Sequence, residues 1–468
     1  MTGWSLSSRA ADAQRLSRSA TVRFAPGRIL PAVLTVIAMP ILARLLSRHE
    51  FGELALLQTV ALLTGSACFG WAEVLIVRAF ASSDRVSEAD LSRLSRPTVG
   101  AVTLIMVIGS GVSYATASVL PLLTAACAVA YASTLVSTAL ARSRQDPALF
   151  VACATIGLGT RFLVGLPLVA LGFGVSGILI AWTIGGTLAL LIAGRRLTLR
   201  WRRFRFPVVD REDVRFAAPV LAVSSGLLAL ALADRIILSG FIPISQIAPY
   251  ALGYAVVDQA ASISFSVLLA SRFPTMVKMF DLRGAEAAGA ELRQAILRFT
   301  AVTTVPLMLL GIYGDRVARL FGGAQYAHAD FRFIPFVAFG LFLNGLHQYL
   351  SIPFQLSRKT GKWAEAVALG VAVNIAANLA FVPLYGTLGA GIATTLGYGA
   401  VVVSLHLRAG ATRTLPPADL MRRALAVASA VAVAVLATRL PWVASAMLVI
   451  GTYLAVAAAS RPALVRYL

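Results

Sequence analysis

Apolar residues fill long blocks from near one end of this chain to the other, and only short polar stretches separate them. A run of about 20 apolar residues can cross a bilayer as a helix. The pattern predicts fourteen membrane-spanning helices, at 28–46, 54–76, 98–119, 121–141, 149–171, 175–194, 215–239, 248–271, 298–320, 333–356, 364–383, 389–407, 423–440 and 443–460.

Composition supports this interpretation. The chain is 58% hydrophobic and 13% charged, with a mean hydropathy of +0.82, whereas soluble domains carry about 25% charged residues. The connectors are too short to fold as soluble domains, so any chemistry must take place within the helical bundle or at its faces. We therefore expect an all-α integral membrane protein with about fourteen transmembrane helices.

The longest polar connector in the first half is basic, RRLTLRWRRFRF at 195–206, and it separates the first twelve spans into six and six. ARLLSRHEFGELALLQTV (43–60) faintly resembles DRIILSGFIPISQIAPYALGYAV (234–256), which is either a parallel internal repeat or a chance similarity of apolar segments. The expected domains are a cytoplasmic tail (1–27), a six-helix bundle (28–194), a basic cytoplasmic linker (195–213), a second, pseudo-symmetric six-helix bundle (214–408), and two further helices with a short tail (409–468).

The net charge is +21, and the lysines and arginines that cause it are concentrated in alternate connectors between the predicted spans. With the N-terminus inside, 33 of the 41 lysines and arginines fall on the cytoplasmic side, which is the positive-inside pattern. This predicts that both termini are cytoplasmic and that residues 241–247 are periplasmic. The basic linker is expected to lie against anionic membrane lipids rather than nucleic acid.

Motifs of soluble enzymes are missing from the sequence. It has no GxxxxGK[ST], HExxH or CxxC motif and no acidic cluster suited to metal-dependent glycosyl transfer, so we expect no catalytic residues, no metal and no cofactor. One GxGxxG occurs, as GFGVSG at 172–177, but it joins two spans and no acidic residue follows about 20 positions later. We interpret it as a tight turn.

Charged residues inside spans are costly, about 2.5–3.5 kcal/mol each at mid-bilayer, and usually have a function or a partner. Arg161 and Asp258 fall deep in their spans, and Asp234 and Arg235 are adjacent within another. Arg161 is either a ligand for an anion or half of an ion pair. Arg44 lies near a span end, where its side chain can also reach the interface. Asp258 and Asp234 are candidates for coupling to a proton or sodium gradient. Near the cytoplasmic end of span 2, Glu73 is expected to pair with Arg78.

A second polar group lies in the eleventh span and the turn after it. Asn374 and Asn378 are four residues apart and share one helix face, as a packing contact or as the wall of a polar cavity. Pro383, Gly386 and Gly389 predict a helix end, a tight turn and a new helix. In span 10, Asn344 and His347 are expected to bond between helices more readily than to bind a ligand.

Several of these stretches together resemble Wzx-type polysaccharide flippases of the multidrug/oligosaccharidyl-lipid/polysaccharide exporter superfamily. The similarity covers residues 30–460, although many members have twelve spans and fourteen is typical of the lipid II flippase branch. The matching stretches are NIAANLAFVPLYGTLGAGIAT, ARLLSRHEFGELALL, FGWAEVLIVRAF, APVLAVSSGLLALALADRIILSGF, YALGYAVV and SRFP.

The resemblance implies two six-helix bundles around a central cavity that opens to alternate sides of the bacterial inner membrane. The implied cargo is an undecaprenyl-diphosphate-linked oligosaccharide destined for O-antigen, capsule or exopolysaccharide. Its diphosphate would be held by Arg161, Arg235 and Arg44, with Asn374, Asn378, Asn344 and His347 as polar cavity residues. A polysaccharide polymerase and a chain-length regulator are expected partners. The alternatives are a lipid II or multidrug exporter and, from the enzyme class, a membrane glycan polymerase or ligase.

Overall fold

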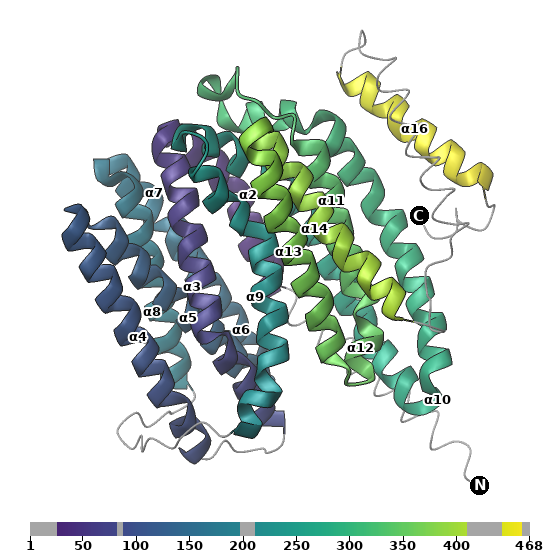
Figure 1. Cartoon of the computed structure of the whole chain (residues 1–468), viewed down its shortest axis with the longest axis horizontal. Helices are drawn as coiled ribbons and strands as arrows, with labels where there is room; N and C mark the ends of the chain where they lie inside the picture. Colours follow the sequence, from purple (N-terminus) through teal and green to yellow (C-terminus); the bar gives the residue numbers. More distant parts are fainter. Residues whose placement is uncertain (1–25, 82–87, 197–210, 410–441, 461–468) are drawn as a thin grey trace. The chain divides into compact units, whose positions relative to one another are not determined.

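The computed structural model describes residues 26–81, 88–196, 211–409 and 442–460, and all regular elements within these ranges are helical (Figure 1). Eight helical stretches in this part of the chain are long and apolar enough to cross a membrane, and the stretch 147–196 alone covers two predicted spans. The predicted span 423–440, nearly all of the N-terminal tail and most of the basic linker lie outside the described residues. The fold class is as predicted.

The chain divides into two compact units between Ala248 and Pro249. The first unit contains α2 (Pro26–Leu45), α3 (Arg48–Ala81), α4 (Glu88–Thr116), α5 (Leu120–Ser143), α6 (Pro147–Leu163), α7 (Gly165–Leu168), the π-helical η1 (Val169–Phe173), α8 (Gly174–Arg196) and α9 (Arg211–Ser239). The second contains α10 (Ile244–Gly322) from residue 249 onward, the 3-10 helix η3 (Ala324–Tyr326), α11 (Ile334–Leu350), α12 (Ile352–Leu356), α13 (Thr360–Tyr385), α14 (Thr387–Arg408) and α16 (Trp442–Ser460).

Helix α9 belongs to the first unit, although we expected it to open the second bundle. It packs along α3, where the Ser66 and Ser225 hydroxyls are 3.2 Å apart. A Cβ atom on Gly70 would lie 2.8 Å from the Cδ1 atom of Leu221. These contacts between α3 and α9 place Arg235, which lies on α9, in the same unit as Arg161.

The interior of the first unit is built around α5, which packs against α3, α6 and α8. A Cβ atom on Gly186 of α8 would lie 2.2 Å from the carbonyl oxygen of Ala130 in α5, so only glycine permits this approach. The GFGVSG segment contains the turn from η1 into α8 and the first residues of α8, with positive φ at Gly172 (93°) and Gly174 (51°). This confirms the interpretation of the segment as a turn.

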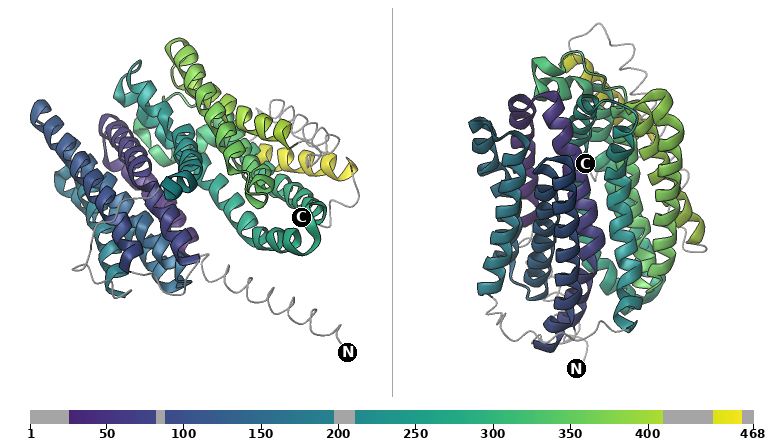
Figure 2. Two further views of the ribbon diagram at one scale, coloured as in Figure 1. Left: turned by 60° about the horizontal axis from the view of Figure 1, so that its bottom comes forward. Right: turned by 60° about the vertical axis from the view of Figure 1, so that its left-hand side comes forward.

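Helix α10 is a long helical hairpin and not two spans joined by a loop. The helical run is broken at Gly284, where φ is 79° and ψ is −174°. Cβ atoms on Gly253 and Gly314, which are almost equally far from Gly284 along the chain, would both touch Ile334. The two legs therefore run side by side in opposite directions (Figure 2), and the predicted connector between the eighth and ninth spans is helical.

The α13–α14 hairpin confirms the helix end and restart predicted from glycine and proline. Helix α13 ends at Tyr385, two residues after Pro383, and α14 begins at Thr387. Gly386 lies between them with φ 56°, and its N–H donates to the carbonyl of Val382 at 2.8 Å. A Cβ atom on Gly389 would lie 2.4 Å from the carbonyl oxygen of Phe381, so the helices approach too closely there for any side chain.

Candidate functional site

Arg161 lies in the last turn of α6, just before the helix is interrupted at Val164. Its guanidinium carbon is 4.7 Å from the centroid of the Trp182 ring of α8 and 5.6 Å from that of Phe162. Stacking over an aromatic face stabilises a desolvated guanidinium by about 2 kcal/mol. The aromatic rings therefore offset part of the cost of burying the charge.

Within the described ranges, Arg161 has aromatic and thiol neighbours but no carboxylate partner. Its Nε atom is buried without a hydrogen-bond partner, and no carboxylate among the described residues forms an ion pair with it. On the facing helices, the Cys127 thiol donates to the Leu179 carbonyl at 3.2 Å. The structural alternative for Arg161, an ion pair with a neighbouring helix, therefore has no counterpart in the described part of the chain.

Asp234 and Arg235 are both buried on α9, at 0% and 7% exposure. The Asp234 carboxylate accepts from the backbone N–H of Arg235 at 2.8 Å, and the Arg235 guanidinium donates to the Ala231 carbonyl at 3.3 Å. Each charged group is thus held partly by its own helix, which fixes its direction. Arg161 and Arg235 both lie in the first unit, on α6 and α9.

Arg44 is exposed in the last turn of α2. The turn that follows it is fixed by a capping box, in which Ser47 Oγ accepts from the Glu50 N–H at 3.2 Å and Glu50 accepts from the Ser47 N–H at 2.9 Å. The sequence carries this signal as Ser-x-x-Glu, within the stretch ARLLSRHEFGELALL.

The second unit buries polar side chains without charge. Asn374 and Asn378 of α13 are 1% and 0% exposed, and the Asn378 amide donates to the Asn374 carbonyl at 2.9 Å and to its side-chain oxygen at 3.2 Å. His347 of α11 is 0% exposed, and its ring lies 6.4 Å from that of Tyr398 in α14. Asn344 of α11 and Asp258 of α10 are half-buried.

Some polar atoms of these buried side chains have no hydrogen-bond partner. Both His347 ring nitrogens, Asn374 Nδ2 and Asn378 Oδ1 are buried with no hydrogen-bond partner in the structure. The asparagines therefore satisfy each other only in part. Buried groups of this kind usually bond to water or to a ligand.

Sequence reasoning missed the contacts that depend on tertiary structure. Glu73 forms an ion pair with Arg142 of α5, a partner that sequence reasoning did not name. The side chain of the predicted partner, Arg78, lies outside the described residues. Trp182 and Tyr398 carried no signal in the sequence, because aromatic residues occur throughout the spans. No group of three metal-ligating side chains comes together in the described ranges.

The match to known proteins is clear at the level of family and fold. The family model described as "Polysaccharide biosynthesis protein" matches residues 41–329. A structure of the lipid II flippase MurJ in an inward closed conformation superposes with a TM-score of 0.72 at 14% identity, covering 95% of this chain and 100% of MurJ.

Two transporters of another kind have a similar fold. An inward-facing MATE-family multidrug resistance transporter of the MOP superfamily gives a TM-score of 0.58 at 15% identity, covering 84% of this chain and 99% of that one. The MATE multidrug transporter DinF-BH gives 0.54 at 14% identity, covering 86% and 97%. A comparison with curated protein sequences gives no match. The chain belongs to the polysaccharide biosynthesis protein family and has the fold shared by MurJ and the MATE transporters.

Proposed function

We propose that this protein is a flippase that carries an undecaprenyl-diphosphate-linked oligosaccharide across the bacterial inner membrane by alternating access. Family membership and the fold of known flippases support the class of activity. The observation that carries the cargo assignment is Arg161, a half-buried cation with a buried Nε, stacked on Trp182 and with no carboxylate partner in the described ranges. Charges without partners inside a membrane are usually functional.

Arginine suits a diphosphate better than lysine does. Its planar guanidinium offers paired N–H donors that match two phosphate oxygens, whereas the lysine ammonium acts as a point charge. Stacking on Trp182 leaves the edge of the guanidinium plane for such contacts. Arg235 and Arg44 are the further candidate phosphate ligands, and Asn374, Asn378, Asn344 and His347 are the candidate polar contacts for the sugars.

The test compares Arg161→Ala and Arg161→Lys in vesicles that contain a fluorescent undecaprenyl-diphosphate oligosaccharide. A hydrogen bond to a charged group contributes about 1.5–3 kcal/mol, so Arg161→Ala should slow flipping about tenfold or more per folded molecule. Arg161→Lys should have an intermediate rate. The matched control is Arg142→Ala, because Arg142 is in the same unit but already pairs with Glu73.

Wild-type flipping per folded molecule in Arg161→Ala would remove this residue from the proposal. Transport of labelled lipid II or of a drug, with no transport of the oligosaccharide, would favour the exporter alternatives. Polymerised glycan formed in the vesicles would instead indicate a polymerase.

We further propose that Asp258 and Asp234 couple transport to a proton or sodium gradient, because deep carboxylates are the usual ion sites of transporters. Asp258→Asn should lower transport and reduce its response to an imposed gradient while the folded yield is unchanged. An unchanged gradient response in this variant would exclude Asp258.

A further inference from the structure

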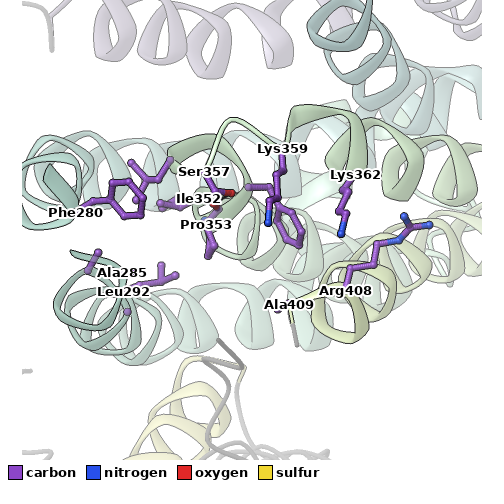
Figure 3. Close-up of a pocket in the computed structure, with 14 residues that line it drawn as sticks. Phe280, Ala285, Leu292, Ile352, Pro353, Ser357, Lys359, Lys362, Arg408 and Ala409 are labelled. Atoms are coloured by element: carbon purple, nitrogen blue, oxygen red, sulfur yellow. Dashed lines mark hydrogen bonds between the residues drawn. The ribbon is translucent and has the colours of Figure 1, made fainter. Parts of the chain in front are cut away.

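One cavity of the second unit lies where three segments distant in sequence come together. It has a volume of about 230 Å³ and is bounded by the turn of α10, by α12 with the start of α13, and by the end of α14 (Figure 3). Helix α13 begins an apolar span at Thr360 and α14 ends one at Arg408, so the cavity lies at the edge of the membrane-spanning region.

The rim of the cavity is cationic. Lys359, Lys362 and Arg408 line it on one side, and all three side chains are exposed (Figure 3). Arg408 forms an ion pair with Glu365 and donates to Ser404 Oγ at 3.0 Å. Neither lysine forms an ion pair with a carboxylate in the part of the chain that the structure describes.

The turn that holds Lys359 has the same backbone hydrogen-bond pattern as a turn in the first unit. The Lys359 N–H donates to the Phe354 carbonyl at 2.8 Å and the Arg358 N–H to that of Gln355 at 3.1 Å, which is a Schellman motif. Arg358 has φ 56°, a conformation that glycine adopts without strain. This turn therefore keeps a strained side-chain-bearing residue directly before Lys359.

The first unit shows what completes such a turn. There, Asp146 and Gln145 donate to Ala141 and Arg142 at 3.0 Å each, and Gln145 has φ 51°. Asp146, the counterpart of Lys359, forms an ion pair with Arg196 at the end of α8. The second unit has lysine at the position of this aspartate, and Arg408 at the end of the partner helix pairs with Glu365 of α13 instead. The turn position itself therefore carries a cation where the first unit carries a carboxylate.

Apart from Ser357, the remaining lining of the cavity is apolar. Phe280, Leu292 and Ile352 contribute side chains opposite or below the basic rim (Figure 3). The volume is less than the about 300–1,000 Å³ of pockets that enclose drug-sized ligands. It suits a headgroup with the first carbons of its chains, while the rest of the ligand stays in the bilayer.

We propose that this cavity binds the phosphate headgroup of an anionic membrane lipid. Lys359 and Lys362 hold the phosphate, and the apolar wall receives the glycerol and the adjoining methylene groups. Basic pockets at the ends of transmembrane helices on the cytoplasmic side are typical headgroup sites, and the charge pattern predicts that side for residues 358–362. The site is independent of the proposed cargo and of Arg161.

The first test is native mass spectrometry of the full-length protein in detergent during titration with phosphatidylglycerol, with phosphatidylcholine as the neutral lipid. Loss of two basic side chains in the Lys359→Gln/Lys362→Gln variant should weaken phosphatidylglycerol binding roughly 30-fold. The matched control is Arg283→Gln/Arg293→Gln, since both arginines are exposed on the α10 hairpin but do not line the cavity. Equal losses in the two double variants would mean general charge attraction and would overturn the proposal.

The second test separates a lipid from a free anion without changing charge. Gly289 lines the cavity, and a Cβ atom there would meet nothing within 4 Å, so the backbone admits a side chain and Gly289→Leu extends one into the space. Phosphatidylglycerol binding should fall in this variant while melting temperature stays unchanged. Undiminished lipid binding in Gly289→Leu would show that the headgroup does not occupy the cavity. Full displacement of the lipid by millimolar inorganic phosphate would show that the lysines select a free anion and not a lipid, and would also overturn the proposal.

Discussion

The α5–α6 turn of the first unit and the α12–α13 turn of the second have the same backbone hydrogen bonds but opposite charge. Each ends a helix with a non-glycine residue at positive φ, Gln145 or Arg358, and then begins the next helix. In the first unit the following residue is Asp146, which accepts from the Leu149 N–H at 3.0 Å and caps α6. In the second it is Lys359, which makes no side-chain cap to α13.

The difference shows how one turn can serve two purposes. An acidic N-cap satisfies a free N–H of the helix and offsets the positive end of the helix dipole. With Arg196 beside it, Asp146 completes the first turn within the chain. Lysine at the same place accepts no hydrogen bond from the first N–H groups of α13. Its positive charge can instead attract an anion from outside the chain. The first turn contributes stability, and in our proposal the second gives up a helix cap in exchange for binding an anion.

The largest effect is expected when the first turn is given the charge of the second. Asp146→Lys removes the N-cap of α6 and places a cation at the start of a helix, which together should cost about 2 kcal/mol of unfolding free energy. Thermal unfolding in detergent measures the loss. Asp146→Asn keeps a capping side chain and serves as the control. An unchanged melting temperature in Asp146→Lys would show that the cap contributes no stability.

The contribution of Asp146 should also depend on pH. The Leu149 N–H, foremost, and Arg196 lower the pKa of the Asp146 carboxyl in the folded protein. Because the folded pKa is depressed, the stabilisation is present above the unfolded pKa and is lost as pH falls through the folded one. The Asp146→Ala variant should be about 1 kcal/mol less stable than wild type at pH 7. The gap should close at acidic pH, and a constant gap would contradict this cause.

The reciprocal change should stabilise the second turn. Lys359→Asp supplies an N-cap for α13 and a carboxylate toward Arg408, and should raise unfolding free energy by about 0.5–1 kcal/mol. The gain is smaller than the loss at Asp146, because ψ of Lys359 is 44° where that of the capping Asp146 is 93°. Phosphatidylglycerol binding should fall in the same variant. Increased stability with unchanged lipid binding would show that Lys359 is not needed to bind the headgroup, and would contradict the proposed exchange of stability for binding.

The smallest effect concerns what the turns share. Gln145→Gly and Arg358→Gly each remove the backbone strain of a side-chain-bearing residue at positive φ. Glycine also makes the unfolded chain more flexible, which opposes the gain. The net gain in unfolding free energy should be about 0.5 kcal/mol and similar in the two variants. Chemical denaturation of both variants provides the comparison. A loss at either position would show that its side chain makes a contact that outweighs the strain.

Several local features could be predicted because their cause lies in neighbouring residues. The asparagine pair, the Gly386 turn and the helical course of the spans follow from spacing and from glycine and proline. The partner of Glu73 could not be predicted, because Arg142 is distant in sequence. The environment of Arg161 could not be predicted either, because the sequence alone does not show that Trp182 lies over its guanidinium.

By itself, the sequence determined that this protein is a helical membrane protein, because the length of each apolar run acts locally through the bilayer. The placement of charge adds the prediction of a positive cytoplasmic side. The sequence also contained the residues of both turns. Only the tertiary structure decided that α9 packs with the first unit, that Arg161 stacks on an aromatic ring, and that Lys359 and Lys362 border a cavity with Arg408. These depend on which helices lie side by side, and that is set by close packing at positions such as Gly186 and Gly389, where a missing side chain permits the approach.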